Sequence, residues 1–112
     1  MTTATDSRVL AIDLDLSLPG GGRLQGRLEH FPQGRSLVVF DEDGITLTPL
    51  TVPIADAGEH HAQLGPNEVL LRNWTDLRGV AAALVAQGHI ELTGREVRIG
   101  DFRLEGLIAR VR

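Results

Sequence analysis

Two of the four histidines in the chain, His60 and His61, lie side by side directly after Glu59. On an extended backbone, side chains two residues apart point the same way, so Glu59 and His61 could converge. With His30 they would supply two imidazoles and one carboxylate, a ligand set used for non-haem iron and for zinc. The spacing matches no specific metal-binding motif, and a solvated loop explains it more simply. We therefore assign no metal site and keep a metal-dependent enzyme using Glu59, His61 and His30 as one alternative.

Other catalytic groups are scarce in this sequence. The chain contains no cysteine and no lysine, and its serines, Ser7, Ser17 and Ser36, lie in or beside predicted strands without a histidine nearby. The glycine-rich stretch PGGG at 19–22 precedes a predicted strand, whereas a phosphate-binding loop precedes a helix. The sequence therefore predicts no cofactor and favours a function other than catalysis.

Composition and charge exclude two classes of partner. The net charge is −4, and neither half of the chain forms the basic patch that nucleic-acid binding requires. No apolar run is long enough to span a bilayer, and the polar first residues resemble no signal peptide. We expect neither nucleic acid nor membrane as a partner, and a cytoplasmic location.

Alternating apolar residues predict antiparallel hairpins in the first half. Residues 8–18 and 23–30 alternate on either side of PGGG, and the expected register places Leu18 opposite Leu24 and Asp15 opposite Arg27. The unbroken apolar run at 37–40 is typical of a strand covered on both faces.

In the middle of the chain, two prolines mark an edge strand, and the spacing of apolar residues then changes from that of a strand to that of a helix. Pro49 and Pro53 predict an edge strand over 45–54, because proline cannot donate to a β-ladder. After a short fifth strand at 68–73, apolar spacing predicts a helix at about 74–87 that ends at Gly88.

The last part of the chain predicts three further strands, separated by Thr93-Gly94 and Gly100-Asp101. We thus expect one domain, residues 1–112, of the α+β class. It would have about eight hairpin-connected, mostly antiparallel strands in a small open barrel or curved sheet, with one helix packed against it.

The predicted helix has an uncharged second face formed by Gly79, Ala82, Ala83 and Ala86. Such small residues let another backbone approach closely, so this face predicts an interface, either with a protein partner or in a homodimer. Two alternatives stay open. Alanine is the best helix former and tolerates water, and a strand layer of the same chain could cover the face.

Three residues define a second alternative, a small-ligand-binding domain. A pocket between sheet and helix could be lined by Trp74, His30 and Phe40. The hypothesis that the sequence favours is a small non-enzymatic interaction or regulatory protein, which binds a protein partner and self-associates. Its candidate surfaces are the small-residue helix face, the proline-containing edge strand and the acidic first half.

Overall fold

The computed structural model describes residues 7–19, 22–44, 47–52, 58, 63–65, 67–74 and 77–112. Its elements, in chain order, are β1 (Arg8–Ser17), β2 (Arg23–Phe31), the 3-10 helix η1 (Pro32–Gly34), β3 (Ser36–Phe40), β4 (Leu47–Pro49), β5 (Glu68–Arg72), α3 (Val80–Ala86), β6 (Ile90–Ile99) and β7 (Leu104–Val111).

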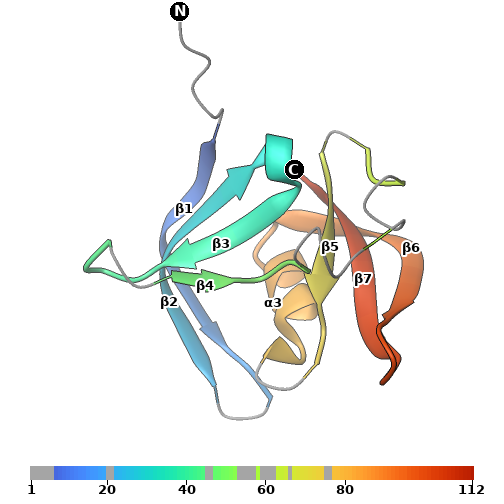
Figure 1. Cartoon of the computed structure of the whole chain (residues 1–112). Helices are drawn as coiled ribbons and strands as arrows, with labels where there is room; N and C mark the ends of the chain where they lie inside the picture. The colour runs from blue at the N-terminus through green and yellow to red at the C-terminus, as the bar shows by residue number, and fades with distance from the viewer. Residues whose placement is uncertain are drawn as a thin grey trace, which may run out of the picture.

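The strands form two open antiparallel sheets (Figure 1). The first has the order β1-β2-β3-β4 and the second the order β5-β7-β6, and helix α3 packs against β6 and β1. This arrangement confirms the predicted α+β class with mostly antiparallel, hairpin-connected strands. It is a pair of open sheets and not a closed barrel. The short strand β4 lies at an edge, as Pro49 predicted.

A short segment after β4 joins the two sheets. The backbone N–H of Leu50 donates to the Leu37 carbonyl of β3, at 2.9 Å. The Leu50 carbonyl accepts from Arg72 of β5, and the N–H of Val52 donates to the Leu70 carbonyl, both at 2.9 Å. Residues 50–52 therefore tie β3 to β5, and both sheets enclose a single main core.

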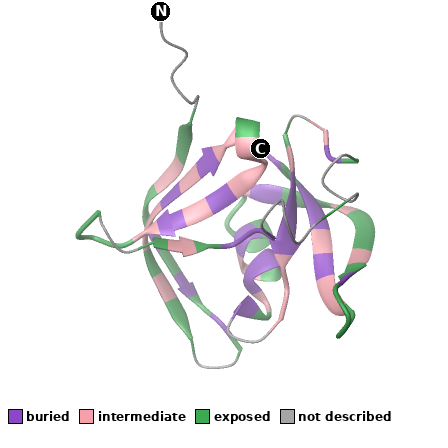
Figure 2. Cartoon of the chain, viewed as in Figure 1, coloured by how far each residue is buried: buried purple, intermediate pink, exposed green. Residues whose placement is uncertain are grey.

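That core contains residues from both sheets and from the helix, as the buried segments in Figure 2 show. Leu28 and Leu37 contribute from the first sheet, Val69 and Leu71 from the second, and Leu84 from α3, all fully buried. Burial of one such side chain stabilises the fold by about 2 kcal/mol, so the two sheets depend on one another for stability.

Strand β5 of the second sheet is covered on both faces. Consecutive residues Val69, Leu70 and Leu71 of β5 are all buried. Val69 and Leu71 face the main core, whereas Leu70 packs in a second cluster with Val52 and Leu64. Among the described residues, β5 is thus the strand with the double coverage that the sequence suggested for 37–40.

The β1–β2 hairpin differs from the predicted register by two residues. Leu16, not Leu18, lies opposite Leu24, and Asp15 pairs with Arg23 at 2.8 Å instead of Arg27. Two irregularities in β1, between Val9 and Leu14, also break the alternation. The predicted inward position of Ile12 is therefore wrong, because this side chain is 75 % exposed.

The helix is shorter than the predicted span 74–87. Gly79 takes a left-handed conformation, with φ +89°, and α3 begins only at Val80. The side-chain oxygen of Asn73 accepts from the Gly79 N–H at 3.1 Å, so Asn73 supports the turn that precedes the helix. No described helix is long and apolar enough to cross a membrane.

The two strands predicted on either side of Thr93-Gly94 are one strand, β6. The register against β7 shifts between Leu92 and Glu96, and the Thr93 hydroxyl donates to the Ile108 carbonyl at 2.9 Å. These contacts identify a bulge, because the chain continues along β7 instead of turning. The second predicted break, Gly100-Asp101, is the turn between β6 and β7.

Replacement of Gly26 by alanine tests the close packing of β2 on the end of β3. Gly26 has φ +140°, and a Cβ there would lie 2.0 Å from the Phe40 carbonyl oxygen. We expect Gly26→Ala to lower the free energy of unfolding by about 3 kcal/mol or more, measured by urea denaturation. Gly94→Ala is the control, because Gly94 also has positive φ but nothing within 4 Å of its added Cβ. Equal losses in the two variants would contradict the close contact.

Candidate functional surface

The outer face of the first sheet is the side turned away from the main core. Alternation places Leu28 of β2 and Val39 of β3 inside, so their neighbours in the chain point outward. We define the outer face by the outward side chains of Val9, Ile12, Arg27, Glu29, Phe31, Val38, Phe40, Leu47 and Pro49. Seven of these nine side chains are apolar. The remaining outward positions of the sheet are polar, namely Asp15, Ser17, Arg23, Gln25 and Ser36, so the apolar side chains gather on one part of the sheet face.

Several of these apolar residues are well exposed. Ile12 is 75 % exposed, Leu47 49 % and Val9 45 %, and Pro49 is also exposed. The outward residues of β3, Val38 and Phe40, are half-buried by neighbouring side chains. Figure 2 shows the alternation of buried and half-buried positions along this strand. Among the described residues, no second layer covers this face as Leu64 and Val52 cover the second sheet.

One cation and one anion lie within the apolar outer face. The Arg27 Nε donates to a Glu29 carboxylate oxygen at 3.0 Å, and the Arg27 guanidinium lies 4.8 Å from the centre of the Phe40 ring. The Phe40 ring in turn contacts Phe31, with 6.3 Å between ring centres. The charges are thus held in fixed positions by neighbouring side chains.

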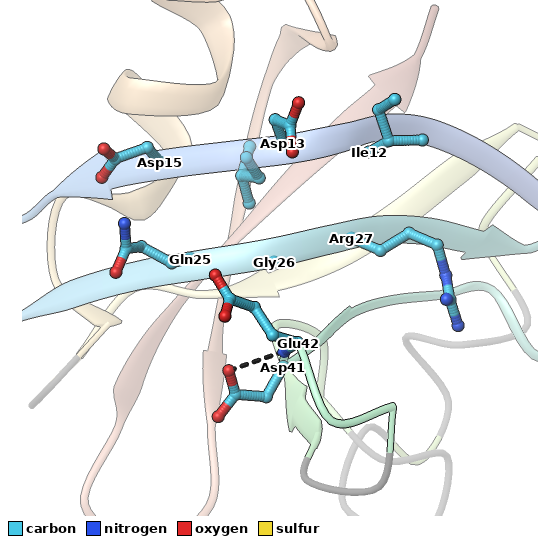
Figure 3. A pocket seen from close by; sticks show the side chains of 9 residues that line it. Ile12, Asp13, Asp15, Gln25, Gly26, Arg27, Asp41 and Glu42 are labelled. Atoms are coloured by element: carbon cyan, nitrogen blue, oxygen red, sulfur yellow. Dashed lines mark hydrogen bonds between the residues drawn. The ribbon is translucent and has the colours of Figure 1, made fainter.

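An open hollow of about 420 Å³ adjoins the outer face at its β1 end (Figure 3). Asp13, Asp15, Asp41 and Glu42 contribute its carboxylates, from β1 and from the turn that follows β3. The Asp15 carboxylate is paired with Arg23, whose hydrogen bonds hold the Asp15 pKa below its ordinary value. The hollow is polar and shallow, and it lacks the apolar enclosure typical of a small-molecule site.

The structure covers two residues of the small-residue helix face and leaves the other two exposed. A Cβ on Gly79 would lie 2.6 Å from the Pro19 side chain, and Ala83 packs against the main core. Only Ala82 and Ala86 are exposed to solvent. Part of this face is therefore covered by the same chain, and the interface predicted there stays a prediction for two exposed alanines.

The residues of the predicted ligand pocket lie on different faces. His30 is inside the first sheet, and Phe40 lies on its outer face. Trp74 packs against the second cluster, with the Arg72 guanidinium 5.7 Å from its ring centre. The structure does not bring these three side chains together, and the described residues form no pocket between sheet and helix that all three line.

His30 is the most deeply buried ionisable side chain of the described residues, at 2 % exposure. Its Nε2 atom has no hydrogen-bond partner among the described residues. Burial lowers the pKa of His30 below its ordinary 6.5, and the positive charges of Arg8 and Arg35 lower it further. The imidazole is therefore neutral at pH 7 and contributes to the fold as part of the interior.

The metal hypothesis falls largely on residues outside the described part of the chain. Glu59, His60 and His61 are not described, so their distance from His30 is not defined. Within the described residues, no group of three or more His, Cys, Asp or Glu side chains is arranged to hold a metal ion. The metal-dependent enzyme stays a hypothesis from the sequence alone.

Sequence reasoning identified part of the outer face but missed its exposure. Phe40 was assigned to a pocket, and Ile12 and the apolar run at 37–40 were assigned to buried positions. The signal was nevertheless present in that run: an apolar strand with two apolar faces needs a cover on each side, and this chain supplies a cover for only one of them among its described residues. Leu47 lies in the predicted edge strand at 45–54, which is one of the candidate surfaces from the sequence.

Comparison with known proteins adds no assignment: no protein-family model matches the chain, and no curated protein or solved structure shows significant similarity to it. We therefore infer the function from the surface itself.

The buried His30 predicts that the protein loses stability on mild acidification. Because the pKa of His30 is lower in the folded chain, the unfolded chain binds more protons as the pH falls below 6.5, and the free energy of unfolding decreases. Asp15 and Glu68, whose pKa values are also lowered, lose their contributions only below about pH 4.5. Urea denaturation at pH 7.5 and 5.5 therefore isolates the histidine effect.

In His30→Gln, most of this loss between pH 7.5 and 5.5 should disappear, since the amide does not titrate. His89→Gln is the matched control, because His89 is less buried, at the end of the helix region. A loss that remains unchanged in His30→Gln and disappears in His89→Gln would contradict the assignment.

Proposed function

We propose that this protein is a small, non-enzymatic interaction module that binds a protein partner through the outer face of sheet β1-β2-β3-β4. The observation behind the proposal is the set of apolar side chains exposed on that face, with Ile12 at 75 % and Leu47 at 49 %. Apolar side chains exposed together on one face favour protein association, because their burial releases ordered water.

The shape of the surface supports a protein partner over a small ligand. The outer face is spread across four neighbouring strands, and the adjoining hollow is open and lined largely by carboxylates. A broad surface that combines exposed apolar side chains with charged groups suits a protein partner better than a small ligand.

The face of the sheet is a better candidate than its β4 edge. Edge pairing uses a row of free backbone groups, and β4 is only three residues long and includes Pro49, which has no N–H. The edge is thus poorly suited to adding a strand. Pro53, the second proline of the predicted edge strand, lies outside the described residues.

The negative charges beside the outer face argue against a nucleic-acid partner. The margin of the outer face carries Asp13, Asp41 and Glu42, which would repel phosphate. A cytoplasmic location, expected from the sequence, also belongs to the proposal.

Replacement of Leu47 by aspartate should abolish partner binding through the outer face. A charge that replaces an apolar side chain within an interface loses its hydration on binding, so capture should fall by at least about tenfold. The experiment compares tagged wild-type protein and Leu47→Asp as bait in extracts of the source organism, with captured proteins, including untagged copies of this chain, quantified by mass spectrometry.

Phe102→Asp is the matched control for this experiment. Phe102 is also a large apolar residue, 89 % exposed, but lies in the turn between β6 and β7 and not on the outer face. This variant should capture the same proteins as the wild type. Retention of those proteins by Leu47→Asp, with unchanged thermal melting, would overturn the proposal.

A further inference from the structure

We infer that the occupant of the outer face is a second copy of this chain, packed face to face about a two-fold axis. This inference rests on the proposed function and specifies its partner. Its basis is the pattern of side chains on the outer face, which is complementary to itself.

The outer face consists of two rows of side chains that cross the strands. In the first row, Val9, Glu29, Val38 and Pro49 lie opposite one another from β1 to β4. In the second row, Arg27, Phe40 and Leu47 lie opposite one another on β2, β3 and β4. On β1, the irregular segment between the partners of Leu28 and Gly26 contains two exposed residues, Ile12 and Asp13. Each row therefore has one charge on β2 and apolar residues on β3 and β4.

A two-fold axis between the sheets, perpendicular to β2 at Leu28, exchanges these two rows. Each strand then lies over the same strand of the second copy, running in the opposite direction. The first row of one copy covers the second row of the other, so Val38 meets Phe40 and Pro49 meets Leu47. The apolar positions coincide, and aligned packing of two sheets is a common arrangement.

The same axis brings opposite charges together. Glu29 of one copy lies over Arg27 of the other, and the pair inside each copy is preserved at 3.0 Å. Four charges then alternate around the axis, and each carboxylate gains a second guanidinium. An axis parallel to β2 would instead place Arg27 over Arg27 and Glu29 over Glu29, so the charges select one of the two arrangements.

The size of the surface fits a weak dimer. The four strands contain 10, 9, 5 and 3 residues, and at roughly 3.3 Å per residue and about 4.8 Å between strands they give a projected face on the order of 430 Å². A standard interface uses about 800 Å² of each partner, measured over the relief of the side chains. The outer face thus lies in the size range of weak interfaces, and we expect the dimer to dissociate on dilution.

Charge reversal tests the arrangement directly. In Arg27→Glu, positions 27 and 29 are acidic in both copies. In Glu29→Arg, the same two positions are basic in both copies. Each variant alone should therefore be monomeric at concentrations where the wild type is dimeric, with the dissociation constant raised roughly a hundredfold. An equimolar mixture of the two should form a heterodimer, because acidic and basic faces again meet.

Native mass spectrometry gives the readout, since isotope labelling of one variant separates the heterodimer from both homodimers. Circular dichroism checks that each variant is folded; if one is not, Arg27→Gln and Glu29→Gln replace the pair, and each should weaken the wild-type dimer. Wild-type dimers that persist in the single variants, or a mixture that forms no heterodimer, would overturn the two-fold arrangement.

The outcome also separates this inference from the proposed function. The wild type could be monomeric at all concentrations, while Leu47→Asp loses a captured protein that Phe102→Asp retains. This result would reject the second copy as the partner and support the interaction surface. A dimer that is unaffected by Leu47→Asp and by both charge reversals, with no captured protein lost, rejects both.

Discussion

The hydrogen bonds of residues 50–52 join the two sheets of this protein. They attach Leu50 to β3 on one side and to β5 on the other, so two open sheets share one interior. Leu50 is itself fully buried there. The apolar inner faces of the two sheets are buried in one core, and α3 contacts both β1 and β6.

The shared interior also determines which surfaces remain. With the helix and both sheets directed at one core, the described chain has a second cover only for β5-β7-β6, where Leu64 and Val52 pack on Leu70. The outer face of β1-β2-β3-β4 is left apolar and open, although the residues of β3 would suit a buried strand on both sides. The interaction function proposed for the protein follows from this asymmetry between the two sheets.

The sequence predicted the class of fold because hairpin alternation and the single helical period are local signals. It missed the register between Leu16 and Leu24, since a shift of two residues keeps every side chain on the same face. The exposure of Ile12 followed from irregular pairing in β1, which alternation cannot reveal. Of the predicted site residues, Phe40 lies on the candidate surface. The sequence could not place it there, because alternation does not show which face of a strand meets the core. Pro19 lies close to Gly79 and covers part of the small-residue helix face. The two residues are far apart in the sequence, so the sequence carried no sign of this contact.

In the inferred dimer, a second copy of this chain covers the outer face at concentrations where the dimer is populated. Hydroxyl-radical footprinting of the purified protein over a range of concentrations detects this cover, with Ile12 as the reporter and the highly exposed Phe102 as the internal standard. Oxidation of Ile12 should fall as the protein concentration rises, while that of Phe102 should stay constant. Oxidation of Ile12 that stays constant relative to Phe102 at every concentration would contradict the dimer.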